Sequence, residues 1–475
     1  MPAEDLNAEL RACLEAWEIA NAATLSEYAS LIESGAMDSL ALFNLAAWIE
    51  EKTGRDINPT AINLPDQWDT IARIIQFVSD SRESAPSMPL SPAHRAIERA
   101  PSVKITRYMA QHAEQVAQLQ KRLWSADAAM NLRYLHWKYF DNPYYDGEAN
   151  IYLAFDGDEL VGMRGFYPSR WQCGVDQNIV EILIADDQTL LDDGRRDGVI
   201  AQIMQHAISD LRSRGRDYLF NLTGGPKTVL GSLVMGWRSA GNWQPWARQS
   251  RRWKRDLGEQ FLRLPGAWRF ADKVVAAHSN RAPFSALDRR TGSRLSVRNI
   301  AISVSKEPRP YDMAALIARL PHDGRIRHLR DEAFLEWKFR NPLHDYRFLF
   351  ASDAQLNGYL VLHRFTHTAA TSRVSIVDLE ADDEITRNAL LDAAIKFGNF
   401  SDLAIWTATL DPLLQLALQV RGFQPTDQHL TTQGCPCVLV RAIDESQQAP
   451  SWSLGSANLL DLANWDLRRV STMAG

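Results

Sequence analysis

Residues 134–143 read YLHWKYFDNP, and residues 334–342 read FLEWKFRNP. Their tryptophans, Trp137 and Trp337, stand 200 positions apart. The same order of elements is predicted after each stretch: three strands, then a helix. Each copy then ends at a glycine followed by an aromatic residue. A motif shared in the same order over about 100 residues indicates two copies of one fold. We interpret the motif itself as structural: a buried tryptophan and an Asn-Pro turn that fixes a helix end.

The hydrophobic pattern around each motif predicts a mixed α/β layer domain. In the first copy, Asp156-Gly157-Asp158 is a hairpin signal between two strands. The expected elements of the first copy are strands at 149–155, 159–167, 178–184 and 218–222, a polar loop at 185–197, and a helix at 199–213. Those of the second are strands at 346–351, 358–365 and 374–379 and a helix at 384–397. The copies close on Gly236-Trp237 and Gly422-Phe423.

The chain begins differently. Residues 1–82 have a helical pattern without a strand signal, and 83–102 form a linker rich in serine and proline. Four short helices, three of them at 3–23, 39–52 and 70–79, would make a small bundle. This head holds 14 Asp/Glu and 5 Lys/Arg, whereas the rest of the chain holds 44 and 47. An acidic head on a mildly basic body favours attraction between the two.

Composition excludes several classes of protein. The body is not basic enough to indicate nucleic-acid binding, and no stretch approaches the roughly 20 apolar residues of a membrane span. Four cysteines are too few for a disulfide framework, and Cys435-Pro-Cys437 has no second Cys/His pair nearby for zinc. The N-terminus is acidic and polar, unlike a secretory signal. We therefore expect a cytoplasmic, metal-free protein.

The stretch Gly35-Ala36-Met37-Asp38-Ser39-Leu40 opens the second predicted helix. Together with the Ile57-Asn58-Pro59 turn and Asp69-Thr70-Ile71, it closely resembles an acyl carrier protein. The resemblance implies that Ser39 is esterified by 4′-phosphopantetheine, whose thiol carries an acyl group as a thioester. A phosphodiester there would lie at a helix N-terminus, where backbone N–H groups and the helix dipole favour negative charge. Implied partners are a phosphopantetheinyl transferase and an acyl-loading ligase or synthase.

The helix after Ser39 departs from that family. Carrier proteins usually show acids along its exposed face, but this chain has Ala41, Asn44, Ala47 and Trp48 there. An exposed apolar surface indicates a dedicated docking partner, and the rest of the same chain is one candidate.

The element order of the two copies resembles the GNAT superfamily of N-acyltransferases. Members bind the pyrophosphate of acyl-CoA with a loop of the form Arg/Gln-x-x-Gly-x-Gly/Ala at a helix N-terminus. The matching residues of the first copy are Arg195, Arg196, Asp197, Gly198 and Val199. Ile200 departs from the small residue expected next.

The second copy lacks this loop. Its matching residues, 381–388, have no glycine, and their acids would repel phosphate. We expect it to be degenerate and non-catalytic. The predicted division is a carrier-like domain at 1–82, a linker at 83–102, GNAT-like domains at 103–255 and 296–445, a bridge at 256–295, and a tail at 446–475.

The resemblance implies direct attack of an amine on a thioester, which needs a base and an acid. The family base often sits on the strand before the loop, and Glu181 occupies that strand; buried among apolar residues, it would accept a proton near neutrality. The alternative is that Glu181 faces outward on an edge strand or pairs with an arginine. The family's tyrosine for the leaving thiolate is replaced by Leu233, so Tyr218 or water must serve, or the thiolate leaves unaided.

The sequence thus predicts a carrier-dependent acyltransferase that moves an acyl group from Ser39 to the amine of a small molecule. Its pathway would make a secondary metabolite or surface glycan. Two alternatives remain open: a loading unit that moves acyl from acyl-CoA onto the carrier thiol, and a non-catalytic platform that presents the loaded carrier.

Overall fold

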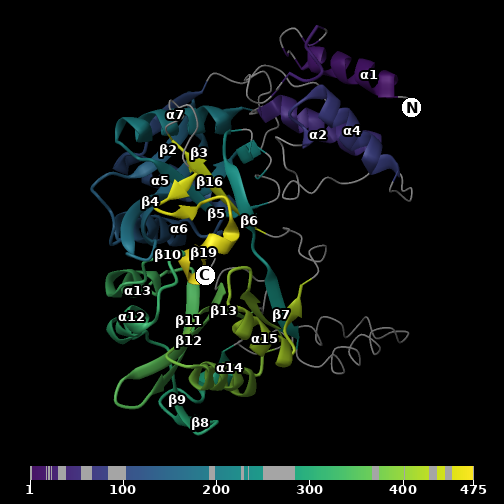
Figure 1. The fold of residues 1–475 in the computed structure, drawn as a ribbon. Helices are drawn as coiled ribbons and strands as arrows, with labels where there is room; N and C mark the ends of the chain where they lie inside the picture. The colour runs from purple at the N-terminus through teal and green to yellow at the C-terminus, as the bar shows by residue number, and fades with distance from the viewer. Residues whose placement is uncertain are drawn as a thin grey trace, which may run out of the picture.

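The structure, a computed structural model, describes most of the chain. The described residues are 3–17, 39–54, 67–83, 103–191, 198–225, 235–249, 284–365, 374–400, 402–426, 436–443 and 452–473, with scattered positions in 19–31 and 229–233. Figure 1 shows two mixed sheets, one in the upper and one in the lower half of the view, and a separate group of helices at the N-terminus.

The head contains three described helices, α1 (Ala3–Ala16), α2 (Ser39–Thr53) and α4 (Ile71–Glu83). Leu10, Ile49 and Ile74, one from each helix, are completely buried. Helix α1 ends earlier than the predicted residue 23. The chain turns there because the Ile19 N–H bonds to the Leu14 carbonyl, which satisfies an end carbonyl and buries the Ile19 side chain. Three of the four expected helices thus lie within the described residues.

The first sheet has the order β1-β2-β3-β4-β5-β16-β6, with β10 and β19 joined to the side of β3. Helices α5, α6 and the π-helical η4 cover one face and α7 the other (Figure 1). The strands are β1 (Lys104–Arg107), β2 (Asn150–Asp156), β3 (Glu159–Cys173), β4 (Asn178–Leu190), β5 (Tyr218–Gly224), β6 (Arg238–Asn242), β10 (Ile326–His328), β16 (Cys437–Ala442) and β19 (Trp465–Asp466). The helices are α5 (Ala113–Leu119), α6 (Ala128–Leu135), η4 (His136–Phe140) and α7 (Val199–Ser213).

Strand β4 continues to Leu190, so the expectation of a loop from residue 185 is wrong. The acidic residues that suggested a loop, Asp186 and Asp187, have partners inside the protein. Asp187 is 1% exposed, and its carboxylate accepts hydrogen bonds from Tyr139 and Trp124. Internal partners replace the water that these acids would otherwise require.

The second sheet has the order β15-β7-β14-β13-β12-β11-β9-β8. Its strands are β7 (Pro245–Gln249), β8 (Arg294–Val297), β9 (Ile300–Ser305), β11 (His344–Ser352), β12 (Leu356–Phe365), β13 (Val374–Ala381), β14 (Asp402–Trp406) and β15 (Gln424–Pro425). Its helices include α12 (Pro310–Arg319), α13 (Glu332–Lys338), α14 (Glu384–Gly398) and α15 (Pro412–Val420). Both predicted α/β patterns are therefore present as mixed sheets.

The two copies exchange a strand. β16, near the end of the chain, lies between β5 and β6 of the first sheet. β7, which follows β6 directly, instead joins the second sheet between β14 and β15. The predicted domains at 103–255 and 296–445 treated each copy as a continuous segment and did not include this exchange.

The repeated tryptophans meet at the boundary between the copies. The rings of Trp137 and Trp337 stack with centroids 4.6 Å apart and planes 9° apart. Each indole Nε1 donates to the other residue's backbone carbonyl, at 2.8 and 2.7 Å. Such reciprocal contacts are typical of a twofold interface. The structural interpretation of the Trp-Lys…Asn-Pro motif fits this arrangement, and Asn142 and Asn341 each accept a backbone N–H two residues on.

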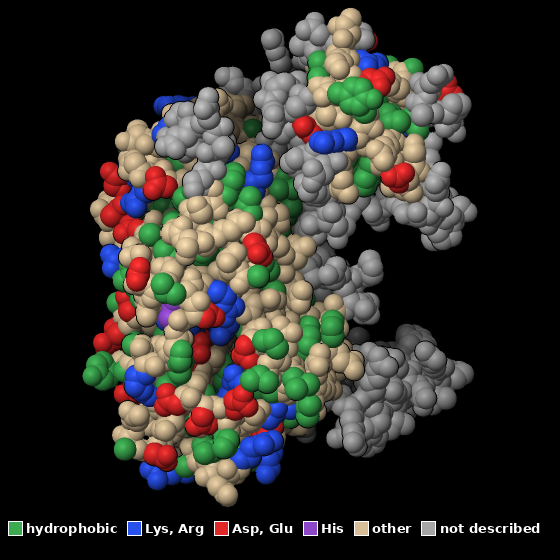
Figure 2. All heavy atoms as spheres, in the orientation of Figure 1, with side chains coloured by type: hydrophobic (Ala, Val, Ile, Leu, Met, Phe, Trp, Pro, Cys, Tyr) green, Lys and Arg blue, Asp and Glu red, His purple; other side chains and the backbone are tan. Residues whose placement is uncertain are grey.

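The visible surface carries Lys/Arg and Asp/Glu side chains interspersed over both sheets (Figure 2). Within the described residues, no helix has both the length and the apolar character needed to cross a membrane.

Candidate functional site

Two parallel strands in the first sheet, β4 and β5, pair with each other over a short stretch only. Strands β4 and β5 pair only at Leu183 with Leu219 and at Ile184 with Phe220. Beyond those residues β4 continues for six residues and β5 for four without pairing with each other, although β4 still pairs with β3 and β5 with β16. Ligands of parallel α/β sheets bind outside the carboxyl ends of strands, so this divergence is the candidate site.

The floor of the divergence is a buried charge cluster on the α5/α6 face. The ammonium of Lys138, 0% exposed, lies 2.8 Å from Asp186 Oδ2 and 3.0 Å from Asp187 Oδ1. Its Nζ also lies 5.3 to 5.5 Å from the ring centroids of Trp124, Tyr134, Tyr139 and Tyr167. Buried charges of this kind persist because each has a partner.

The backbone bulges at this cluster. Asp187 adopts φ +51°, and the β3–β4 register shifts between Met163 and Gly165. A Cβ on Gly165 would lie 1.8 Å from the Tyr139 hydroxyl oxygen, so only glycine fits beside that ring. Bulges near sites re-aim the strand and free backbone groups from the ladder.

Helix α7 begins near the end of β4, because the side chains of Val199 and Leu190 both lie within 3.5 Å of the position of a Cβ on Gly162. Gly198 precedes it with φ +81°, and no side chain in the described residues caps its first N–H groups. The predicted loop residues Gly198 and Val199 lie here, with Val199 fully buried. Arg195, Arg196 and Asp197 lie outside the described residues. An uncapped helix N-terminus favours an anion.

A buried arginine lies on the same face of the sheet as α7. Arg164 pairs across the strands with Tyr152, whose hydroxyl donates to Asp210 of α7, so both side chains lie on that face. Arg164 is 3% exposed, and its Nε has no hydrogen-bond partner in the described part of the chain. Burial lowers the pKa of Arg164 to about 10. A buried guanidinium with an unused donor is costly and suits an anionic ligand.

The two predicted catalytic residues are not brought together. Glu181 lies on β4 two residues before Leu183, on the α7 face, and forms ion pairs with Arg216 (3.2 Å) and Arg170 (3.9 Å). Its side chain is 32% exposed, which matches the alternative of an arginine-paired Glu181. Tyr218, at the start of β5, packs partly against the core on the opposite face.

Sequence reasoning missed Lys138, Asp186, Asp187 and Arg164 as features of this site. The repeated Trp-Lys pair was a signal for Lys138, but its carboxylate partners are 48 and 49 positions away and were assigned to a loop. Nothing in the sequence marks Arg164, because a lone arginine in a strand usually faces water.

The corresponding place in the second copy is closed. The Asp383 carboxylate caps α14, accepting from Thr386 N at 2.7 Å. Asp378, equivalent to Asp186, is held by the Tyr359 hydroxyl at 2.7 Å and by Arg330. The acids at this helix therefore have protein partners, and one of its first N–H groups is already used by the chain's own carboxylate.

A separate hollow of about 900 Å³ lies where the copies meet, between α6/η4 and α13. The edges of Trp137 and Trp337 form its floor, and exposed His136, Glu336 and Arg340 line its sides. In the head, Ser39 is the first residue of α2, whose first turn has no acidic residue.

No protein-family model and no curated protein matches the chain. Three solved structures are similar to it over 72% of its length. They are a GCN5-related N-acetyltransferase from Anabaena variabilis (TM-score 0.47, 12% identity, 73% of that chain), a probable N-acyltransferase from Enterococcus faecalis (0.46, 9%, 73%), and a tandem GNAT protein from the clavulanic acid biosynthesis pathway (0.43, 10%, 99%). None of the three is more than 12% identical to this chain.

Proposed function

We propose that the protein is an acyltransferase that takes an acyl group from a phosphopantetheine thioester on Ser39 and passes it to the amine of a small molecule. The observation that carries this proposal is the contrast between the copies. Both copies have parallel strands that pair only briefly, but the helix that follows begins uncapped at Gly198 in the first copy and is capped by Asp383 in the second. The proposal therefore places the donor in the first copy.

The residues around the point where β4 and β5 separate fit a phosphate-bearing donor. The N-terminus of α7 offers backbone N–H groups, and Arg164 offers a buried cation with an unused N–H on the same face. Either would favour the phosphate of a pantetheine arm over a neutral ligand. Acyl-CoA carries the same arm and is the alternative donor. The first turn of α2, which holds no acid, likewise fits a phosphodiester on Ser39.

When bound, the donor supplies a thioester carbonyl carbon that an amine can attack. Backbone N–H groups of β4 beyond the bulge at Asp187 would polarise that carbonyl. Glu181 is the proposed proton acceptor for the amine, because it lies on the face that carries Gly198 and Arg164. To accept this proton, the Glu181 carboxylate must leave its ion pair with Arg216 and contact the amine. Tyr218 lies on the other face, so water is the better proton source for the leaving thiolate.

The test starts with the carrier. Wild type and Ser39→Ala are incubated with coenzyme A and a broad phosphopantetheinyl transferase, and intact masses are compared. We expect a gain of one phosphopantetheine in wild type alone. The holo-protein is then loaded with a labelled acyl group and mixed with candidate amines, and amide formation is measured.

Other outcomes separate the alternatives. Labelled acyl-CoA that places label on the holo-protein without any amine would indicate the loading unit. Full turnover by Ser39→Ala with acyl-CoA as sole donor would contradict the carrier role while keeping the acyltransferase. A modified carrier that neither gains nor loses acyl groups in these assays would indicate the platform.

A further inference from the structure

The second copy has its own diverging strands, but a segment of the chain fills them. β13 and β14 pair in parallel from Val374 to Ile376 and then separate. The space left between them is only about 10 Å³. Arg468 and Arg469, from the end of the chain, line it together with residues of β13, β14 and α15.

We infer that the cleft of the second copy is a binding site for the chain's own C-terminal segment, residues 465–473, and that the chain therefore offers one donor cleft, not two. The count of donor clefts rests on the proposed function. The occupation of the second cleft by the segment does not.

The two arginines are held by specific partners. The Arg469 guanidinium lies 4.8 Å from the centroid of the Trp406 ring at the end of β14. Its Nη1 donates to Ser375 Oγ on β13 at 2.5 Å, so one side chain bridges both diverging strands. Arg468 lies 3.6 Å from Glu380, further along β13. Cation–π contacts and charge-assisted hydrogen bonds of this kind are the stronger polar contacts in proteins.

The backbone of the segment is also bound. Thr409 Oγ1 accepts from Leu467 N and donates to the Leu467 carbonyl, both at 2.9 Å. The buried Lys338 ammonium donates to the Thr472 carbonyl at 2.6 Å. Val470 is 0% exposed and Thr472 is 1% exposed. The segment is therefore bound inside the protein, in the way that a ligand is bound in a site, and does not lie on the surface.

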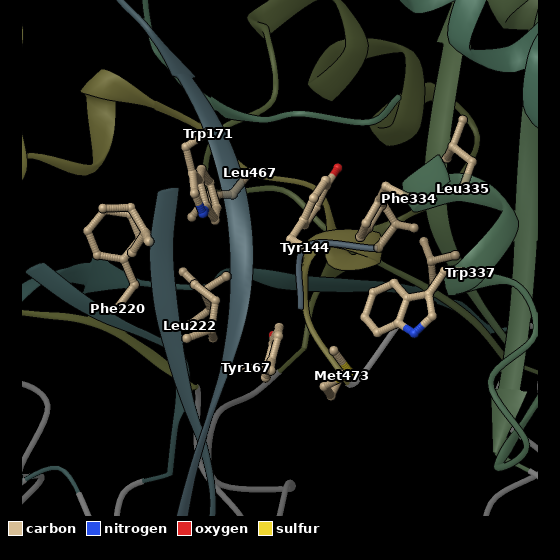
Figure 3. Close-up of a cluster of buried hydrophobic side chains, with 14 of the residues drawn as sticks. Tyr144, Tyr167, Trp171, Phe220, Leu222, Phe334, Leu335, Trp337, Leu467 and Met473 are labelled. Atoms are coloured by element: carbon tan, nitrogen blue, oxygen red, sulfur yellow. The ribbon is translucent and has the colours of Figure 1, made fainter. Parts of the chain in front are cut away.

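The same segment reaches the first copy. β19 pairs in parallel with β10, which pairs with β3 of the first sheet. The Trp465 ring lies 4.9 Å from Phe220 and 5.7 Å from Trp171, centroid to centroid. Figure 3 shows Leu467 beside Trp171 and Met473 between Tyr167 and Trp337. The segment thus connects the filled space in the second sheet to the buried core of the first sheet.

The filled cleft would suit a cationic peptide better than a phosphate-bearing arm. Asp378 and Glu380 on β13 face Arg330 and Arg468, and Asp383 caps the helix that would otherwise receive phosphate. A donor would have to displace two partly buried arginines from their partners, and its phosphate would then lie beside carboxylates. Both steps are unfavourable.

The direct test supplies the segment in trans. A chain ending at Asn464 is mixed with a fluorescein-labelled peptide of residues 465–475, and binding is followed by anisotropy. We expect saturable 1:1 binding, and at least about tenfold weaker binding of the peptide carrying Arg468→Ala and Arg469→Ala, from the loss of one cation–π contact and charged hydrogen bonds. A labelled peptide of the same composition in scrambled order is the control. Equal binding of all three peptides would overturn the inference.

A second measurement covers the case in which the shortened chain fails to fold. Hydrogen exchange is compared between full-length Arg469→Ala and Arg340→Ala; Arg340 is an exposed arginine that pairs with Glu336. We expect faster exchange in residues 465–473 and in β13 for the first variant alone. Unchanged exchange in that segment would overturn the inference.

The number of donor clefts is measured separately by equilibrium dialysis of Ser39→Ala with coenzyme A. One molecule bound per chain is expected, and two would overturn the single-cleft inference. Binding of none would count against coenzyme A as donor, and the peptide experiment would still decide the role of the segment.

Discussion

The repeated lysines show how one residue can take two roles in two copies of a fold. Lys138 and Lys338 follow the two stacked tryptophans, and both are 0% exposed. Lys138 has two carboxylates, Asp186 and Asp187, within 3.0 Å. Lys338 donates to the carbonyl of Thr472. Burial, helped by the positive charge of Lys138, lowers the pKa of Lys338 to about 7.

Replacing each lysine by methionine should therefore have different results. Lys138→Met leaves Asp186 and Asp187 without their buried cation, and we expect it to lower the free energy of unfolding by about 3–5 kcal/mol. Lys338→Met removes a buried cation that lacks a carboxylate within 4.0 Å among the described residues, so we expect a change of less than about 1.5 kcal/mol. Urea unfolding at pH 7 measures both. Equal losses would contradict the assignment.

The same pair gives a pH test. The pKa of Lys338 is lower in the folded protein than the roughly 10.4 of an unfolded chain, so between about pH 7 and 10 the unfolded state binds more protons. Stability from this group therefore rises with pH across that window and is lost as the pH falls. Lys338→Met should flatten this rise relative to wild type, as measured by urea unfolding at pH 7, 8 and 9. Parallel profiles would show that the lysine titrates normally.

At the scale of elements, the two helices that follow the third long strand of each copy differ at their first residue. α7 starts after Gly198 with φ +81° and has no side-chain cap, whereas α14 starts with the Asp383 carboxylate bonded to Thr386 N. A capped N-terminus has used one of its free donors for the protein's own stability. An open N-terminus keeps them for a ligand.

Substituting these two positions should separate stability from donor binding. Asp383→Ala should lower the free energy of unfolding by about 1 kcal/mol and leave the KM for the acyl donor unchanged. Gly198→Ala puts a Cβ at a left-handed φ and should raise that KM severalfold by shifting the loop. Denaturant unfolding and donor titrations distinguish the two. A raised donor KM in Asp383→Ala would place a donor in the second copy.

Sequence periodicity located these elements because they alternate regularly. The second copy is the clearest case: strands predicted at 346–351, 358–365 and 374–379 are observed as β11, β12 and β13, with the helix at 384–397 as α14. The prediction from the pattern was wrong where polar residues of a strand point inward to partners inside the protein. Asp186 and Asp187 looked like a loop because their partners, Lys138 and Tyr139, are distant in sequence.

At the scale of the whole molecule, the repeat predicted two sheets but not their connection. Strand β16 closes the first sheet although it follows the whole second copy, and β7 closes the second although it follows β6. The sequences of the two strands, Cys437–Ala442 and Pro245–Gln249, do not state which sheet each strand joins. The candidate site was also predictable only in part. The sequence predicted that Gly198 precedes a helix, but it did not predict the buried charges of Lys138, Asp186 and Asp187.

Because the two copies exchange strands β7 and β16, neither copy can fold from one continuous segment of the chain. A fragment of residues 103–249 would lack β16 and expose the edges of β5 and β6, which are templates for aggregation. We expect it to be insoluble or to lack a cooperative thermal transition.

A matched fragment tests the cause. Asn242 pairs with Cys437, and Trp243 N bonds to the Pro436 carbonyl at 3.0 Å, so the end of β6 lies beside the start of β16. Joining residues 103–243 to 436–443 through a short Gly/Ser linker would restore the missing strand as a hairpin with β6. This fragment should be more soluble than 103–249 and regain a cooperative transition by circular dichroism. A cooperative, monomeric 103–249 fragment would show that the exchanged strand is dispensable, and the first copy would then be an independent domain.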